Sequence, residues 1–316
     1  MAVKITRKQR FRGSEAANGL AMISPTAFYA ILLLAAPLAM IFLYSFWTDG
    51  YLTIIHQFQL CNYYGPCASY KEVDGILQPT QEYLGAWSDP LTRTLMLRSL
   101  YVSLTVTAVT VILAFPVAYF VSFYVEASRK SLWLFLITIP FWTSYLIRVF
   151  LWKVIIGYNG VINTGLLELG LISEPLSINY SINAVIITLA HAYAPFAILP
   201  IFVALEKIDR SFLEAGRDLG ESPFMTFIRV TLPLAMPGVI SAVLIVFIPT
   251  IGDYVTPLLV GGPEGKMVAN MIELSFKKLD NYPRGAAIAI SSMAMVLGVS
   301  LLFLFLNRRF LKGNKA

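Results

Sequence analysis

Residues 206–233 read EKIDRSFLEAGRDLGESPFMTFIRVTLP and separate two long apolar stretches of the chain. Ser211 and Glu214 have the spacing of a capping box, which predicts a helix that begins just after Ser211. Gly220 suits the left-handed conformation that ends a helix, and the Ser-Pro pair at 222–223 predicts a second helix start. The segment is therefore expected to form two short helices joined at a glycine.

The first of these helices would carry an apolar face beside a charged edge. The face has helical spacing and consists of Phe212, Ala215, Gly216 and Leu219. The edge consists of Glu214, Arg217 and Asp218. A helix this short is not stable alone, so it needs a surface to pack on. That surface is either the membrane with the neighbouring loops, or a soluble partner.

Apolar stretches on both sides of this segment are long enough to span a bilayer, which requires about 20 residues of helix. The six expected spans are residues 21–46, 99–124, 132–150, 182–205, 234–252 and 285–306. The 316 residues are 57% hydrophobic and 13% charged, whereas soluble domains carry roughly 25% charged residues. The sequence therefore predicts an all-α membrane protein with six transmembrane helices, and argues against a soluble enzyme.

The distribution of Lys and Arg predicts that both termini lie in the cytoplasm. In that orientation the inner segments hold 15 basic residues and the outer segments hold 9. The domains are then a basic N-terminus (1–20), a first span (21–46), an outer loop (47–98), a five-helix core (99–306) and a tail (307–316). Because the apolar core of the first span is too long for a signal peptide, it is expected to be an uncleaved anchor. The basic residues flank spans instead of forming one patch, so nucleic-acid binding is not expected.

The largest outer loop contains both cysteines, Cys61 and Cys67. On this topology they face an oxidising compartment, where a small disulfide can form. Two unpaired thiols are the alternative. Two cysteines are too few for a disulfide scaffold or a thiolate metal site, and no metal site is expected.

The segment at 206–233 resembles the EAA signature of permease subunits in bacterial ABC importers. Glu214, Ala215 and Gly216 are followed after three residues by Gly220, and after nine more by VTLP at 230–233. Gly216 stands where the signature has alanine, and valine replaces isoleucine in the final element. The resemblance implies a type I importer permease fold in which this loop is a cytoplasmic coupling helix. Glu214, Ala215, Gly216 and Gly220 would then dock on an ATPase subunit.

Two further stretches are similar to spermidine/putrescine permeases. They are IPFWTSYLIR at 139–148 and FIPTIGDYVTP at 247–257, the latter followed by GGP at 261–263. The resemblance implies a second, related permease subunit, two ATPase subunits, a periplasmic binding protein and a location in the bacterial inner membrane. Transport would proceed by alternating access. Opine, aminophosphonate and iron permeases share much of the pattern and remain alternatives for the cargo.

Asp253 is a charged residue in an otherwise apolar stretch and is flanked by Pro249, Gly252 and Pro257. These neighbours predict a break in the helix, and broken backbone at membrane depth must line a cavity or be buried in protein. An ionisable residue there is a candidate functional group. Asp253 and Tyr254 are expected to offer a carboxylate and an aromatic face to a passing ammonium group. Alternatively, Asp253 lies outside the bilayer or pairs with a basic residue of a partner.

Aromatic residues surround Pro140 in the third expected span. Trp142 and Tyr145 are candidates for the substrate path, although packing is the more ordinary role of such residues. Arg148 and Lys153 are expected to extend to the outer surface. His191 is expected to make an interhelical hydrogen bond. A short interfacial helix is expected within residues 154–181.

No phosphate-binding loop, metalloprotease motif or nucleophile elbow is present in the sequence. The chain is therefore not expected to be an enzyme or to bind a cofactor, and ATP and Mg²⁺ would be bound by partner subunits. A secondary transporter is an alternative, but it should show inverted repeats and several intramembrane charges. An intramembrane enzyme or an assembly scaffold is a third alternative, for which no catalytic constellation is visible.

Overall fold

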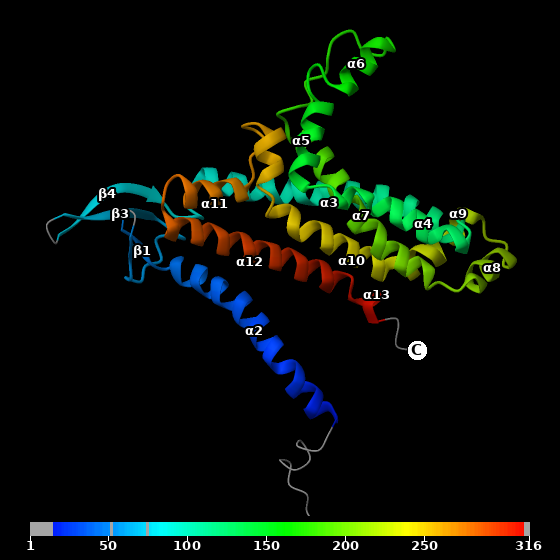
Figure 1. Cartoon of the computed structure of the whole chain (residues 1–316), viewed down its shortest axis with the longest axis horizontal. Coiled ribbons are helices and arrows are strands. Elements are labelled where there is room, and N and C mark those ends of the chain that lie inside the picture. Colours follow the sequence, from blue (N-terminus) through cyan, green and yellow to red (C-terminus); the bar gives the residue numbers. More distant parts are fainter. Residues whose placement is uncertain (1–14, 51–52, 74–75, 313–316) are drawn as a thin grey trace, which may run out of the picture.

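The structure is a computed structural model that describes residues 15–50, 53–73 and 76–312 and is mainly helical (Figure 1). The long helices are α2 (Glu15–Tyr44), α3 (Pro90–Phe123), α7 (Ile182–Glu206), α10 (Leu232–Ile251) and α12 (Tyr282–Leu306). The short helices are α4 (Ala127–Thr138), η1 (Ile139–Trp142), α5 (Tyr145–Ile155), α6 (Val161–Glu168), α8 (Arg210–Asp218), α9 (Pro223–Thr226), η2 (Phe227–Thr231), η3 (Pro257–Gly261), α11 (Val268–Lys277) and α13 (Arg308–Lys312). Within the described ranges, five helices are long and apolar enough to span a membrane, or six if one bent pair forms a single span.

The core lies between α3, α7 and α10, which run side by side (Figure 1). Close packing of α10 on α7 depends on Gly238, because a Cβ there would lie 2.4 Å from the Cβ of Ala204. A second apolar cluster joins α3 and α10 to α11 and α12, at the end of the bundle where α3 and α12 begin. Because these contacts bury one side of each helix, the opposite sides keep exposed apolar residues that suit lipid or a partner.

Five of the six expected spans coincide with long helices, but the third does not form one straight helix. Residues 132–150 fall in α4, η1 and α5, and the chain bends by 88° between the segments Ala127–Trp142 and Tyr145–Ile155. Pro140 lies in η1 at the bend, where a proline removes a helical hydrogen bond. The expectation of a continuous third span is therefore wrong, and Figure 1 shows α5 leaving the direction of α4.

The outer loop is also more ordered than a simple connector. Its last residues belong to α3, which begins at Pro90 with Asp89 as its N-cap. The strands are β1 (Thr48–Asp49), β2 (Ile54–Ile55), β3 (Pro66–Val73) and β4 (Ile76–Leu84), paired antiparallel as β1 with β2 and β3 with β4. The β3–β4 hairpin projects from one end of the bundle (Figure 1). We call the described residues from 45 to 89 the cap.

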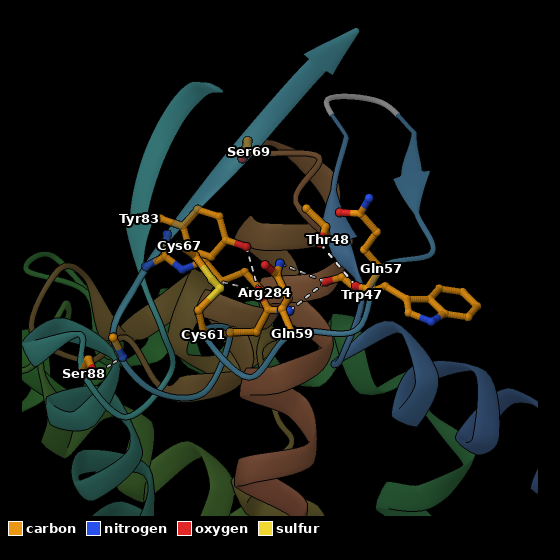
Figure 2. The surroundings of a disulfide bond; sticks show 12 residues. Trp47, Thr48, Gln57, Gln59, Cys61, Cys67, Ser69, Tyr83, Ser88 and Arg284 are labelled. Carbon is orange, nitrogen blue, oxygen red and sulfur yellow. Dashed lines mark hydrogen bonds between the residues drawn. A yellow bond between two sulfur atoms is a disulfide. The ribbon is translucent and has the colours of Figure 1, made fainter. Parts of the chain in front are cut away.

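A disulfide joins Cys61 to Cys67 at the base of this hairpin, which confirms the expected clip (Figure 2). Between them in the sequence, the side chain of Asn62 is fully buried and links two parts of the cap. Its Nδ2 donates to the carbonyl oxygens of Ser45, at 3.1 Å, and Trp47, at 2.8 Å. Its Oδ1 accepts from the Tyr83 hydroxyl at 2.7 Å. The disulfide and Asn62 thereby fasten the end of α2 to the hairpin.

The cap is in turn tied to α3 and α12 by an ion pair. Arg284 Nη2 lies 3.0 Å from Asp89 Oδ2, and its guanidinium lies 5.7 Å from the centre of the Tyr83 ring. Burial alone would raise the pKa of Asp89, but hydrogen bonds from Thr92 and Leu91 and the charge of Arg284 hold it below its ordinary value. Helix α2, whose most apolar stretch has no buried residue, diverges from the bundle (Figure 1). The cap therefore provides much of the attachment of α2 to the bundle.

The first part of the expected N-terminus (1–14) and the end of the expected tail (313–316) lie outside the described residues.

Candidate functional site

The first candidate site is the coupling loop, residues 206–233, at the end of the bundle opposite the cap (Figure 1). Its helix α8 begins at Arg210, and Asp209 is the N-cap, with Oδ1 accepting from the backbone N–H of Ser211 at 2.9 Å. This hydrogen bond lowers the pKa of the Asp209 carboxyl. The expected capping box of Ser211 and Glu214 is therefore wrong, because an aspartate two residues earlier already supplies the acceptor.

The end of α8 follows the expected glycine stop. Gly220 has φ +81°, and its N–H donates to the carbonyl of Arg217 at 2.9 Å, while the N–H of Glu221 donates to the carbonyl of Gly216 at 3.1 Å. These two bonds form a Schellman motif. Ser222 then caps the short helix α9 by accepting from the N–H of Met225 at 3.3 Å. The expected pair of short helices joined at a glycine is confirmed.

The apolar face of α8 is divided between the loop and the solvent. Gly216 is buried, and a Cβ there would lie 3.2 Å from Cγ2 of Thr226, so this residue allows α8 to pack on α9. Phe212 and Leu219 point outward, and Leu219 is 85% exposed. Glu214 and Ala215 are also exposed. The loop thus supports itself from within and leaves an exposed apolar and charged surface.

The second candidate site is the polar break after α10. Asp253 is only 8% exposed, and its Oδ1 accepts from the backbone N–H groups of Val255 at 2.9 Å and Thr256 at 3.3 Å. Its Oδ2 accepts from the hydroxyl of Tyr145, which also lies 2.7 Å from the hydroxyl of Thr256. The break is where Pro249, Gly252 and Pro257 predict it. The carboxylate therefore caps the turn that follows through Oδ1 and accepts from Tyr145 through Oδ2.

The structure brings together some of the expected path residues and not others. Tyr145 and Asp253 are hydrogen-bonded across 108 positions of sequence. Tyr254 is partly exposed, with Lys277 Nζ 5.6 Å from its ring centre. Trp142 is 81% exposed, and within the described residues it makes no hydrogen bond or ring contact with Tyr145 or Asp253. The geometry therefore supports a Tyr145–Asp253 pair and does not place Trp142 with it.

Arg148 is buried, contrary to the expectation that it extends to the outer surface. It is 9% exposed, and its guanidinium donates to the carbonyl oxygens of Ala192 and Thr143, both at 3.3 Å. The expectation assumed a straight span, whose end would lie at the surface. Because the chain bends before Tyr145, Arg148 instead turns toward α7.

The structure also places the other residues that the sequence analysis named in this region. Trp152 Nε1 donates to His191 Nδ1 at 3.0 Å, which confirms the interhelical hydrogen bond of that histidine. Lys153 is half-buried, with its Nζ 5.6 Å from the centre of the Tyr180 ring. A short helix, α6, occurs within residues 154–181. In the part of the chain that the structure describes, no three His, Cys, Asp or Glu residues gather as metal ligands.

The described apolar helices, five of them long enough to span a membrane or six if the bent pair is one span, indicate a multi-pass membrane protein. Residues 111–312 match the family model described as "Binding-protein-dependent transport system inner membrane component", and the chain belongs to this family. This membership establishes a type I ABC permease fold and a transport role. It favours an ATP-driven permease over a secondary transporter.

Curated relatives carry more specific names. The spermidine/putrescine transport system permease protein PotB of Escherichia coli K12 is 38% identical over 223 residues, which cover 71% of this chain and 80% of that protein. PotB of Haemophilus influenzae is 37% identical over 72% of this chain and 78% of that protein. The inner membrane ABC transporter permease protein YdcU of Escherichia coli K12 is 32% identical over 66% of this chain and 70% of that protein.

Among solved structures, a chain of a bacterial ABC transporter involved in the import of the acidic polysaccharide alginate has a TM-score of 0.61. It shares 16% sequence identity, and the match covers 92% of this chain and 94% of that chain. At this identity the likeness establishes the fold alone. The structural match includes residues before 111, where the match to the family model begins.

Proposed function

We propose that this chain is a permease subunit of an ATP-driven importer that moves polyamines, spermidine and putrescine, into the cytoplasm. The observation that carries the proposal is the 38% identity to PotB permeases over 71% of the chain. The PotB relatives are named for spermidine and putrescine transport, which favours polyamines over an opine, an aminophosphonate or iron. A multi-pass permease of this family would lie in the bacterial inner membrane, with both termini in the cytoplasm.

The proposed complex contains a second, related permease, two ATPase subunits and a periplasmic binding protein. A curated relative named as a PotC homologue, 33% identical over 37% of this chain, supports a different second permease in place of two copies of this one. ATP and Mg²⁺ would be bound by the ATPase subunits. This chain would supply the path and the coupling surface.

The coupling surface is the exposed side of α8. Glu214, Ala215 and the neighbouring apolar side chains would contact the ATPase, while Gly216 and Gly220 would keep the loop in the shape that presents them. A helix of nine residues cannot be stable without a surface to pack on, and an exposed Leu219 supplies apolar area for a partner.

The substrate path is proposed to pass the break at Asp253. In alternating access, the carboxylate would exchange its hydrogen bond from Tyr145 for an ammonium group of the cargo as the path opens. Tyr254 offers an aromatic face beside it, and its partial exposure supports this role. Trp142, which is exposed and distant from that pair, would take part only if the bend between η1 and α5 changes.

The test is to reconstitute the four-component complex in lipid vesicles and to measure ATP hydrolysis with loaded binding protein. Spermidine or putrescine is expected to stimulate hydrolysis by about fivefold or more, whereas an opine or an aminophosphonate is not. A Glu214→Gln, Gly220→Ala double variant should lose this stimulation. Glu168→Gln, which changes an exposed glutamate on the short helix α6, is the matched control.

Stimulation by a different ligand would contradict the cargo and leave the importer standing. An ATPase that does not co-purify with the wild-type chain would contradict the importer itself.

A further inference from the structure

Helix α4 is held to the bundle by few side chains. None of its residues is buried. The residues that turn inward, Lys130, Leu134 and Ile137, have helical spacing, and Leu134 and Ile137 pack on the core. The other side of the helix carries exposed apolar residues, which include Trp133 and Phe135. Its contacts with the bundle are therefore this narrow stripe and one ring contact, between Trp133 and Phe120 of α3, whose ring centres lie 5.6 Å apart.

The strongest contact in that stripe is an ion pair at the first turn. Lys130 Nζ lies 2.6 Å from Glu206 Oε1, and it also donates to the carbonyl oxygen of Ser122 at 2.8 Å. The Ser122 hydroxyl donates to the same Glu206 oxygen at 2.7 Å. Three elements meet here, because Ser122 lies near the end of α3, Lys130 in α4 and Glu206 at the end of α7.

This ion pair differs from an ordinary surface pair. The side chains of Lys130 and Glu206 are 15% and 34% exposed, and both charges are bonded to Ser122, Lys130 through its carbonyl and Glu206 through its hydroxyl. Charge-assisted hydrogen bonds of this kind are short and strong. By contrast, the nearby Arg129–Glu126 pair is 3.8 Å apart and highly exposed on both sides, so it should contribute little.

The position of the pair connects the two candidate sites. Glu206 is separated from Asp209, the cap of α8, by two residues, of which Ile208 is buried in the core. From Lys130, α4 runs nine residues, about 13 Å of helix, to Ile139 at the start of η1. Beyond the bend, Tyr145 bonds Asp253. The segment from α4 to α5 is thus fastened at one end to the coupling loop and at the other to the polar break.

We propose that the Lys130–Glu206 pair is the link by which a movement of α8 is passed to the bent segment α4–η1–α5 and so to the Asp253 break. Lys130 and Glu206 are positioning residues that make hydrolysis productive, and this role rests on the proposed function. Because α4 has no buried residue, little else fixes its first turn to the end of α7. Without the pair, the coupling loop would still move when the ATPase moves, but the bent segment α4–η1–α5 would not move with it.

The experiment measures ATP hydrolysis and polyamine uptake in the same vesicles, since their ratio reports coupling and loss of folded protein lowers both together. Glu206→Gln and Lys130→Gln are each expected to keep hydrolysis within about twofold and to lower uptake per ATP by about fivefold. The double variant should be no worse than either single variant, and Lys130→Arg should retain at least half of the wild-type ratio. Glu126→Gln, which removes a carboxylate from the exposed pair beside it, is the matched control and should match wild type.

Three results would overturn the link: an unchanged ratio in both single variants, losses that add in the double variant, or equal losses in Lys130→Arg and Lys130→Gln. These results differ from a failure of the proposed function, in which the wild-type complex itself shows no polyamine-stimulated hydrolysis. If the double variant is not recovered in the membrane, the comparison of Lys130→Arg with Lys130→Gln still decides.

Discussion

Asp253 has a structural role as the cap of a turn and a proposed role in attracting an ammonium group of the cargo. Its Oδ1 caps a turn through two backbone N–H groups, and its Oδ2 accepts from Tyr145. A cap needs an acceptor oxygen, which asparagine also has, whereas attraction of an ammonium group needs the negative charge. The two tasks can therefore be separated by one substitution.

Asp253→Asn is expected to keep the cap, with thermal stability within about 1 kcal/mol of wild type, and to lower polyamine uptake by about tenfold or more. Asp253→Glu retains the charge and should keep more uptake than Asp253→Asn. Both quantities would be measured on the same preparation, by thermal unfolding and by vesicle uptake. Wild-type uptake in both variants would exclude a cation contact at this residue.

Arg148 shows how a bend changes the environment of a single side chain. Its charge has backbone carbonyls as partners in the described structure, and its Nε makes no hydrogen bond there. A buried charge held by imperfect partners adds little net stability, and an apolar residue of similar volume is often tolerated. The space that the side chain fills should matter more than its charge.

Arg148→Met is accordingly expected to change the free energy of unfolding by no more than about 1 kcal/mol, whereas Arg148→Ala should cost about 2–4 kcal/mol through lost packing. Thermal or denaturant unfolding in detergent would compare them. Equal destabilisation by the two substitutions would mean that the charge itself holds α5 to α7.

At this scale the sequence predicted the break around Asp253, because prolines and a glycine have local effects. It could not predict Tyr145 as the partner, since 108 positions separate the two residues and nothing local pairs them. The position expected for Arg148 was wrong for a related reason. Its depth depends on the bend between η1 and α5, and amino-acid composition does not indicate the angle of a bend.

Among the elements, residues 206–233 show that a glycine can define the shape of an exposed loop, which we propose to be a docking surface. Gly220 ends α8 in a left-handed conformation, and the chain then turns into α9. A residue with a Cβ resists this conformation, and the two bonds of the Schellman motif depend on it.

Gly220→Ala is expected to destabilise the loop by about 1–2 kcal/mol and to weaken co-purification of the ATPase. Gly165→Ala is a suitable comparison, because Gly165 lies within helix α6 and a Cβ there would meet nothing within 4 Å. That change should be neutral or slightly stabilising. Equal recovery of the ATPase with both variants would mean that the left-handed turn is not needed for docking.

The elements also show where local patterns suffice. Caps, stop signals and apolar length act within a few residues, so the two helices of the coupling loop and five long helices could be predicted. The bend of α4 into α5 was missed because 132–150 is continuously apolar and Pro140 can be accommodated in a kinked helix. The β3–β4 hairpin was missed because β4 is exposed at every position except Tyr83, which leaves no alternation of apolar and polar residues to detect in that strand.

In the molecule as a whole, the cap adds polar contacts between helices that also pack through apolar residues. The Arg284–Asp89 pair, in which both side chains are about 15% exposed or less, joins the cap and the start of α3 to α12. The pKa of Asp89 in the folded protein is below its ordinary value of 3.8. A lowered pKa means that the ionised carboxylate, with its hydrogen bonds from Thr92 and Leu91 and its pairing with Arg284, stabilises the fold fully above about pH 4. This contribution is lost as the pH falls through the folded-state pKa.

Asp89→Asn is therefore expected to lower the stability at neutral pH by about 1 kcal/mol and to weaken its fall below pH 4. Melting temperatures of wild type and Asp89→Asn between pH 7 and 3 would measure this. Glu82→Gln, at an exposed position of the same cap in the β3–β4 hairpin, is the control. Parallel pH curves for wild type and Asp89→Asn would show that other carboxylates cause the acid sensitivity.

The disulfide at the base of the hairpin has a consequence for biogenesis. On the proposed topology, Cys61 and Cys67 can pair only after the loop between α2 and α3 has been translocated, because disulfides form in oxidising compartments. Insertion of those two helices is therefore expected to precede closure of the clip. Completion of the cap beside the end of α2 would then depend on the cell's thiol-oxidising machinery as well as on the membrane-insertion apparatus.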